Sequence, residues 1–330
     1  MKVAVIGVGS MGINHLRVYT ELEGVEVVGA SDISSERLQL VAGRFSVKTY
    51  PDYEELITKE KPDAVSITVP TSEHEKVATF CLEHGADLLV EKPIAATVEE
   101  GRRLITLAEK LGKQLMVGHI IRFNPAMQSL KQRLENGDVG KIFQVFCRRA
   151  GPFPARIRDV GVVVDLAPHD IDIMRFLTGK DPKRVFAETE QRIHTDHEDM
   201  LFGLLRFPDG ITGALEINWL TPTKMRETLV LGEKGLFRVD DLMQDLYFYE
   251  NPQAVGELWS PFRAIRGVSE GSMTRFSIKR QEPLKAELKA FIEAVGNDKP
   301  VPVSGQDGLE ALRLSLALVE SGKYHRVIEV

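Results

Sequence analysis

Two polar residues near the middle of the chain, Asp165 and His169, are spaced for joint chemistry. They stand four positions apart, so on a helix both side chains lie on one face. Pro168 is tolerable only in a first turn, which predicts that both groups lie near a helix amino terminus. An imidazole beside a carboxylate can take the proton of a hydroxyl while hydride leaves the same carbon. The alternative is a capping aspartate beside a half-buried histidine.

A third candidate is Lys92, in the sequence Glu91-Lys92-Pro93. The apolar run 87–90 before it has the character of a buried strand, and residues 97–111 after it are helix-like. Open α/β sheets bind their ligands at the carboxyl ends of strands, and the proline restricts the backbone that carries the lysine. We therefore expect Lys92 to contact a reacting group. The competing interpretation is a solvated lysine in an ordinary loop.

Two groups of acids and histidines contain typical metal ligands. They are Asp165, His169, Asp170 and Asp172 in one stretch, and His194, His197 and Asp199 in another. Neither has a recognised zinc spacing, and proton handling by Lys92 and His169 needs no metal. We expect no metal site.

The amino terminus carries a glycine pattern between a strand and a helix. The apolar run 3–6 ends in Gly7-x-Gly9-x-x-Gly12, and residues 13–22 have a helical pattern. Such glycines let the chain turn sharply and let backbone N–H groups approach a pyrophosphate at the positive end of the helix.

An acidic residue follows the second strand-like run at the distance that this pattern requires. Asp32 lies 20 residues after Gly12 and can accept hydrogen bonds from both hydroxyls of an adenosine ribose. Its carboxylate would repel a ribose 2'-phosphate, so we expect NAD rather than NADP, although Arg37 could reach back. The alternative is a glycine-rich turn with an unrelated capping aspartate.

The remaining elements indicate two domains. Apolar runs alternate with helical stretches up to residue 118, which predicts an α/β Rossmann domain, a doubly wound parallel sheet covered by helices, over residues 1–120. Residues 121–330 have longer strand patterns and a Pro208-Asp209-Gly210 turn, which predict an α+β domain with a large, mostly antiparallel open sheet. Its expected helices cover 125–136, 166–177, 283–295 and 308–321, and the last ones could pack back on the first domain.

The amino-acid composition disfavours nucleic-acid-binding and membrane proteins. The 330 residues are 43% hydrophobic and 27% charged, with a net charge of -6, so no general attraction to nucleic acid or anionic membranes is expected. Cys81 and Cys147 lie far apart and outside any C-x-x-C spacing, as in a reducing cytoplasm. No apolar run is long enough for a bilayer, so we expect a cytoplasmic protein that acts on small molecules.

With the glycine pattern, Glu91-Lys92-Pro93 and Asp165-x-x-x-His169 in this order, the chain resembles the glucose-fructose oxidoreductase, inositol dehydrogenase and MocA (Gfo/Idh/MocA) family. The resemblance covers essentially the whole length. It implies a Rossmann domain followed by an α/β domain whose open sheet commonly forms an oligomer interface, hence a homodimer or homotetramer. Residues 118–125 and 148–159 look most like the UDP-N-acetylglucosamine 3-dehydrogenases, although Thr71 stands where many relatives have Asn.

The resemblance assigns site residues. His169 would be the general base, Lys92 would donate to the reacting oxygen and Asp165 would orient the site. Predicted cofactor contacts are Gly7, Gly9, Ser10, Met11, Gly12, Asp32, Arg37, Pro70, Thr71, His74, Glu91 and Lys92, with a purely structural role as the alternative for His74. Predicted substrate contacts are Arg122, Asn124, Arg156, Arg158, Asp165 and His169.

Four arginines bear on the substrate. Arg148, Arg149, Arg156 and Arg158 lie within eleven residues of an otherwise acidic chain, and Arg156 and Arg158 could clamp a UDP diphosphate. The alternative is solvated or interface arginines. We therefore expect an NAD-dependent dehydrogenase acting on C3 of a UDP-linked N-acetylhexosamine. The alternatives are a dehydrogenase of a free sugar or inositol, and a catalytically silent, cofactor-sensing regulator.

Overall fold

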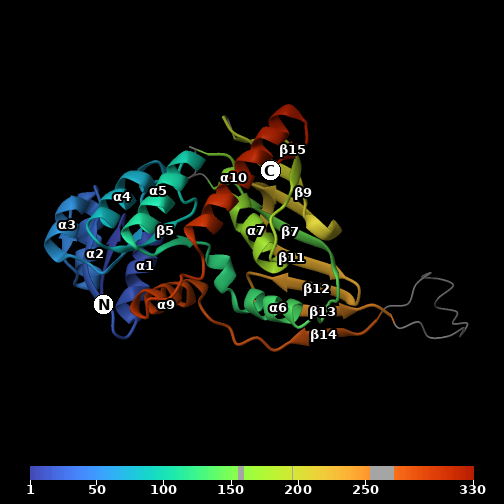
Figure 1. The fold of residues 1–330 in the computed structure, drawn as a ribbon, viewed down its shortest axis with the longest axis horizontal. Coiled ribbons are helices and arrows are strands. Elements are labelled where there is room, and N and C mark those ends of the chain that lie inside the picture. Colours follow the sequence, from blue (N-terminus) through green and yellow to red (C-terminus); the bar gives the residue numbers. More distant parts are fainter. Residues whose placement is uncertain (155–159, 195, 253–270) are drawn as a thin grey trace, which may run out of the picture. The chain divides into compact units, whose positions relative to one another are not determined.

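The computed structural model describes residues 1–154, 160–194, 196–252 and 271–330, and the chain divides into two units (Figure 1). Unit 1 comprises residues 1–123 and 282–313, and unit 2 comprises residues 124–281 and 314–330. Helix α10 (Gly305–Tyr324) contributes residues to both. None of the helices in the described residues has the length and apolarity needed to cross a membrane.

Unit 1 is built on a six-stranded parallel sheet in the order β3-β2-β1-β4-β5-β6. The strands are β1 (Lys2–Ile6), β2 (Glu26–Ser31), β3 (Thr49–Tyr50), β4 (Ala64–Ile67), β5 (Asp87–Glu91) and β6 (Leu115–Gly118). The connecting helices are α1 (Ser10–Glu21), α2 (Ser35–Phe45), α3 (Tyr53–Glu60), α4 (His74–Glu83) and α5 (Val98–Leu111). Strands β1, β4, β5 and β6 are almost wholly buried apolar runs, as in sheets covered on both faces. This confirms the predicted Rossmann domain.

Residues far along the chain complete this unit. Helix α9 (Pro283–Gly296) packs on α1, and Lys285 donates to Glu21 at 2.9 Å. At the edge of the sheet, Val117 of β6 donates its backbone N–H to the carbonyl of Val303 at 3.2 Å. The edge strand is thus partly paired by the segment that precedes α10, which limits its exposure to other chains.

Unit 2 is built on a nine-stranded sheet in the order β14-β13-β12-β11-β7-β10-β9-β8-β15, whose strands pair antiparallel except for β7 with β10. The predicted open, mostly antiparallel sheet is therefore confirmed. The strands are β7 (Ile142–Pro152), β8 (Arg184–Glu190), β9 (Met200–Arg206), β10 (Thr212–Asn218), β11 (Leu220–Gly232), β12 (Gly235–Asp240), β13 (Asp245–Glu250), β14 (Met273–Phe276) and β15 (Ile328–Glu329). The short helix η3 (Pro208–Gly210) joins β9 to β10, as the Pro-Asp-Gly sequence predicts.

The two faces of this sheet differ. Helix α7 (Val162–Thr178) packs on β7, β9 and β10, and α6 (Pro125–Glu135) packs on β12 and β13. The residues that face these helices, such as Val145, Leu201 and Leu215, are buried. The residues that alternate with them include Phe202 and Leu204, whose exposed fractions are 52% and 51%. One face of the sheet therefore lacks a helical cover within the described chain.

Candidate active site

The glycine loop of unit 1 has the shape that a pyrophosphate site requires. Gly7 has φ +86°, and a Cβ atom there would lie 2.8 Å from the backbone of Thr68. A Cβ atom on Gly12 would lie 1.9 Å from the carbonyl oxygen of Gly7. Because a side chain at either position would fill the turn, only glycine brings the first turn of α1 this close to the strands. Gly9 caps the helix, and Ser10 and Met11 form its exposed first residues, whose N–H groups have no partner within the helix.

Asp32 lies at the end of β2 and is not a helix cap. Its Oδ2 accepts from the backbone N–H of Val8 at 2.8 Å, and its Oδ1 accepts from that of Ser34 at 2.8 Å. Ser34 is the cap of α2, so the capping alternative for Asp32 is wrong. Arg37 reaches back to Oδ2 at 3.5 Å, but its side chain is 57% exposed. The loop and the fixed carboxylate together fit the pyrophosphate and the adenosine ribose of NAD.

The loop after β4 is held by a buried histidine. Pro70 is followed by the short helix η1 (Thr71–Glu73) and then by His74, which is 1% exposed. The His74 Nδ1 lies 2.9 Å from the carbonyl oxygen of Pro93 and Nε2 lies 3.0 Å from that of Val69. Burial lowers the pKa of His74. Both ring nitrogens face backbone carbonyls, so the geometry favours the structural role for His74.

Glu91 and Lys92 follow at the end of β5. The backbone N–H of Lys92 lies 3.2 Å from Glu91 Oε2, and the Lys92–Pro93 peptide bond is cis. Glu91 Oε1 lies 3.1 Å from Nε2 of His15, a fully buried residue of α1. His15 is not among the predicted site residues, although a histidine three residues after Gly12 on a helix that borders the sheet is a usable signal.

In unit 2, helix α7 carries Asp165 and His169, both half-buried. The helix begins at Val162, four residues earlier than expected, so Pro168 lies in its second turn and the first-turn placement was wrong. The cause is Glu198, which accepts from the N–H of Val162 through its carbonyl at 2.9 Å and from that of Val163 through Oε1 at 3.2 Å. The cap residue is Gly161, so the capping alternative for Asp165 is also wrong.

The position of Glu198 also explains why residue 161 is a glycine. A Cβ atom on Gly161 would lie 2.0 Å from Oε1 of Glu198, so any side chain there would displace the carboxylate that begins α7. Glu198 is remote in sequence and lies between two strands. No local pattern could have identified it.

A buried charge cluster supports the other face of α7. Arg149 of β7 donates to both oxygens of Asp170, with Nη2–Oδ1 at 2.7 Å and Nε–Oδ2 at 2.9 Å, and its Nη2 lies 3.5 Å from Oδ2 of Asp241. All three side chains are at least 95% buried. Burial raises the pKa of Asp241 to about 7, opposed by Arg149. Asp170, the residue after His169, is thereby fixed to the sheet.

Arg226 of β11, which is also not among the predicted site residues, borders the same region. Its Nη1 donates to the carbonyl of Ala150 at 2.6 Å. Burial lowers the pKa of Arg226 to about 10, with Arg149 adding to the shift and the charges of Asp170, Asp241 and Asp165 opposing it. A half-buried cation thus shares the electrostatic environment of Asp165.

Two predicted substrate contacts are engaged elsewhere. Arg122 is 7% exposed and pairs with Asp307 at 3.1 Å. Asn124 is 2% exposed, caps α6 by accepting from Ala126 at 3.0 Å, and donates to the carbonyl of Asp241 at 2.9 Å. These contacts show that both groups help to hold the fold, and their assignment to substrate stays a prediction.

Two of the four arginines in the predicted substrate-binding segment do not lie together. Arg148 and Arg149 point to opposite faces of the sheet, and Arg148 Nε donates to Glu216 at 2.8 Å. Arg156 and Arg158 lie outside the described residues.

The acids weighed as metal ligands have other partners. Asp199 accepts from the N–H groups of Arg192 at 3.0 Å, Ile193 at 2.5 Å and His194 at 2.9 Å, and Asp170 binds Arg149. In the part of the chain that the structure describes, no group of three His, Cys, Asp or Glu side chains is arranged for a metal ion.

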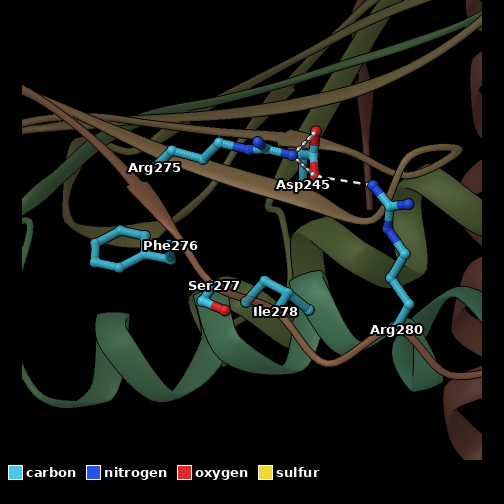
Figure 2. A pocket seen from close by; sticks show the side chains of 6 residues that line it. All are labelled: Asp245, Arg275, Phe276, Ser277, Ile278 and Arg280. Carbon is cyan, nitrogen blue, oxygen red and sulfur yellow. Dashed lines mark hydrogen bonds and ion pairs between the residues drawn. The ribbon is translucent and has the colours of Figure 1, made fainter.

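Unit 2 also has a surface pocket, in which Figure 2 shows Arg275 and Arg280 on either side of Asp245, with Phe276, Ser277 and Ile278 nearby. Asp245 lies 2.9 Å from Arg275 and 3.5 Å from Arg280. The Arg275 and Arg280 side chains are 56% and 58% exposed. Because both arginines engage Asp245 in an exposed ion-pair group, we assign the pocket no chemistry.

Comparison with known proteins identifies both units by family. Residues 1–119 match the model described as "Oxidoreductase family, NAD-binding Rossmann fold", and residues 127–238 match the "GFO/IDH/MocA C-terminal domain". The rhizopine catabolism protein MocA of Rhizobium meliloti is 30% identical over 97% of this chain and 94% of its own length.

Two enzymes of stated substrate are similar over nearly the whole chain. A UDP-N-acetylglucosamine 3-dehydrogenase of Acidithiobacillus ferrooxidans is 29% identical over 96% of this chain and 95% of its own, and its solved structure superposes with a TM-score of 0.87 over 98% of both chains at 28% identity. A myo-inositol 2-dehydrogenase of Thermotoga maritima is 26% identical over 100% of this chain and 98% of its own. The predicted NAD cofactor and the expectation of an oxidoreductase are confirmed.

Proposed function

The chain belongs to the Gfo/Idh/MocA family of NAD-binding oxidoreductases that act on CH–OH groups, and from this premise we propose that it oxidises a secondary hydroxyl of UDP-N-acetylglucosamine, at C3. The observation that carries the proposal is the likeness to the Acidithiobacillus ferrooxidans enzyme, which extends over 96% of the chain. Membership of an enzyme family disfavours the silent regulator.

The chemistry divides between cofactor and protein. Bound NAD accepts the hydride that leaves the substrate carbon. In the proposal, His169 takes the hydroxyl proton, so the carbon loses two electrons and one hydrogen to the nicotinamide while the proton passes to the imidazole. Asp165, on the same face of α7, orients the imidazole.

Lys92 has a separate role in the proposal. Its ammonium would donate a hydrogen bond to the reacting oxygen and stabilise the negative charge that develops as the proton leaves. The position at the carboxyl end of β5 supports this role, because ligands of doubly wound sheets bind at that edge.

The first test compares substrates. With NAD present, UDP-N-acetylglucosamine should drive NADH formation, measured by absorbance, whereas UDP-glucose controls for the N-acetyl group. UDP alone should compete with substrate and raise the melting temperature, since a ligand at 100 times its dissociation constant stabilises by about 2.7 kcal/mol. Turnover of myo-inositol without any effect of UDP would instead support the second candidate, which the similarity to the Thermotoga maritima enzyme favours.

The arginine clamp is part of the same proposal and rests on the sequence alone. Arg156→Ala and Arg158→Ala should raise KM for the nucleotide sugar with little change in kcat, because a diphosphate contact binds ground and transition states alike. Arg148→Ala is the matched control, since Arg148 already pairs with Glu216. Equal effects of all three substitutions would argue against the clamp.

The proposal also includes self-association as a homodimer or homotetramer. The surface involved would be the face of the unit 2 sheet that lacks a helical cover within the described chain. Leu204, Ala214, Phe146 and Leu229 are in register across four neighbouring strands on that face. A contiguous apolar row of this kind is normally buried against another surface. Light scattering at micromolar concentration should give a multiple of the 36.9 kDa chain mass, and Leu204→Glu should shift it toward the monomer.

A further inference from the structure

A line of buried polar groups runs across unit 1, from helix α1 to strands β4 and β5. His15 and Tyr19 lie one turn apart on α1 and are both fully buried. His15 Nδ1 lies 3.2 Å from Oγ of Ser66 on β4, and the Tyr19 hydroxyl lies 2.7 Å from the same oxygen. His15 Nε2 lies 3.1 Å from Glu91 on β5.

The donors and acceptors of this line are matched to one another. An ionised Glu91 can only accept, so Nε2 of His15 carries a hydrogen and donates it to the carboxylate. Nδ1 of His15 and the Tyr19 hydroxyl both face the Ser66 hydroxyl. Each buried polar group of the line therefore has a hydrogen-bond partner.

The sheet is shaped to hold the carboxylate in this place. Ser66 pairs with Leu89, and Glu91 pairs with Gly118, so Ser66 and Glu91 lie on one face of adjacent strands. A Cβ atom on Gly118 would lie 3.1 Å from the Glu91 carboxylate. Any other residue at 118 would crowd the group that His15 holds.

Glu91 in turn interacts with Lys92 in two ways. Its carboxylate accepts a hydrogen bond from the Lys92 backbone N–H, and the Lys92 charge favours its ionised form. Burial alone would raise the pKa of Glu91, but the hydrogen bond and charge of His15, with the charge of Lys92, lower it. The titratable groups acting on Glu91 are thus His15 from α1, Lys92 beside it, and His74 from α4, whose pKa the Glu91 charge raises.

We propose that His15 and Glu91 form a positioning pair that holds Lys92 in place and links it to α1, the helix whose first turn forms the pyrophosphate site. The proposal rests on the catalytic role given to Lys92 under the proposed function. His15 contacts no reacting atom and acts through Glu91. A displacement of a catalytic group by about 1 Å can cost about a hundredfold in rate, so the pair is expected to affect turnover strongly.

The experiment compares His15→Leu, which removes both ring nitrogens, with His15→Gln, whose amide can still donate to Glu91. His15→Leu should lower kcat at pH 7 about tenfold or more, with a smaller change in KM for NAD, and His15→Gln should restore most of the loss. Tyr19→Phe is the control at the far end of the line and should leave kcat within about twofold while lowering stability, as expected for a lost hydrogen bond.

The pH profile separates positioning from damage to the fold. In the wild type, Glu91 stays ionised because its pKa is lowered. In His15→Leu, Lys92 alone opposes the effect of burial, so the pKa of Glu91 should be higher than in the wild type, and kcat should fall as pH decreases through that new value and recover as pH rises. Glu91→Gln in the same background should abolish this recovery. A pH-independent loss in His15→Leu would overturn the proposal.

A second readout needs neither cofactor nor substrate. In the full-length protein without NAD, acetylation of Lys92 by acetic anhydride is followed by mass spectrometry at pH 8. Removing either member of the pair releases Lys92 from its place, so labelling should be about threefold or more faster in Glu91→Gln and in His15→Leu than in the wild type. Tyr19→Phe should label at the wild-type rate.

The outcomes distinguish the two proposals. If Lys92→Ala keeps full turnover, the catalytic assignment fails whatever the labelling shows. If Lys92→Ala is inactive but His15→Leu matches the wild type in kcat, pH profile and labelling, the assignment stands and the positioning pair is refuted.

Discussion

The two units fix their functional groups by different means. In unit 1 the predicted pyrophosphate site is formed by backbone: Gly7 and Gly12 let α1 approach the strands, and backbone N–H groups fix the carboxylate of Asp32. In unit 2 helix α7, which carries the proposed base His169, is fixed by charged side chains, with Glu198 at its first turn and Arg149 on Asp170. Substitutions at the predicted site of unit 1 should therefore act on binding and chemistry, whereas substitutions of the buried charges that fix α7 should act first on folding.

The largest expected effect tests the buried charges. Arg149→Met leaves Asp170 and Asp241 buried without their cation and should cost about 3–5 kcal/mol in the free energy of unfolding, measured in urea. Arg148→Met changes the neighbouring residue, whose partner Glu216 is partly exposed, and should cost about 0–1 kcal/mol. Similar losses in the two variants would contradict the role given to the buried charges in fixing α7.

The next effect concerns chemistry without unfolding. Lys92→Ala and His169→Ala should each lower kcat about a hundredfold or more, the usual contribution of positioned acid–base groups. The melting temperature should stay near that of the wild type for Lys92→Ala, because Lys92 follows a strand end in a half-buried loop. Near wild-type turnover of folded variants would remove these residues from the mechanism.

A smaller effect measures the electrostatics of the cofactor site. Asp32 should favour NAD over NADP by about tenfold in kcat/KM, equivalent to about 1.4 kcal/mol, through repulsion of the 2'-phosphate. Arg37→Ala should widen the preference, because Arg37 lies 3.5 Å from the carboxylate and offsets part of its charge. Equal efficiency of the two cofactors in the wild type would show that Arg37 cancels Asp32.

The smallest effect is a pH dependence of stability in unit 2. The pKa of Asp241 is raised to about 7, so between the ordinary carboxyl range and pH 7 the unfolded chain has released a proton that the folded protein retains. The free energy of unfolding should therefore decrease as pH rises through this window. Asp241→Asn should flatten the dependence of the melting temperature on pH between about 5 and 8. An unchanged slope would assign the dependence to other groups.

The sequence predicts most of unit 1 and less of unit 2 because local signals suffice only for the first. The glycine spacing, Asp32 and the strand before Lys92 depend on short-range geometry. The early start of α7 depends on Glu198, and the pairing of Arg149 with Asp170 depends on strand register, neither of which has a local signature. The contacts of Arg122 and Asn124 lack a local signature for the same reason, since their partners Asp307 and Asp241 lie more than a hundred residues away.

The placement of His74 has a consequence for the loops that carry Thr71 and Lys92. Its ring faces a carbonyl of each loop, and a lowered pKa keeps the ring neutral at neutral pH, with a single N–H group. At any moment that hydrogen serves either the Val69 carbonyl or the Pro93 carbonyl, and the other carbonyl faces a lone pair. A change of tautomer would transfer the bond from one loop to the other without moving a heavy atom. The two loops thus compete for one proton, and a ligand that accepts or donates near either carbonyl would bias which loop is held.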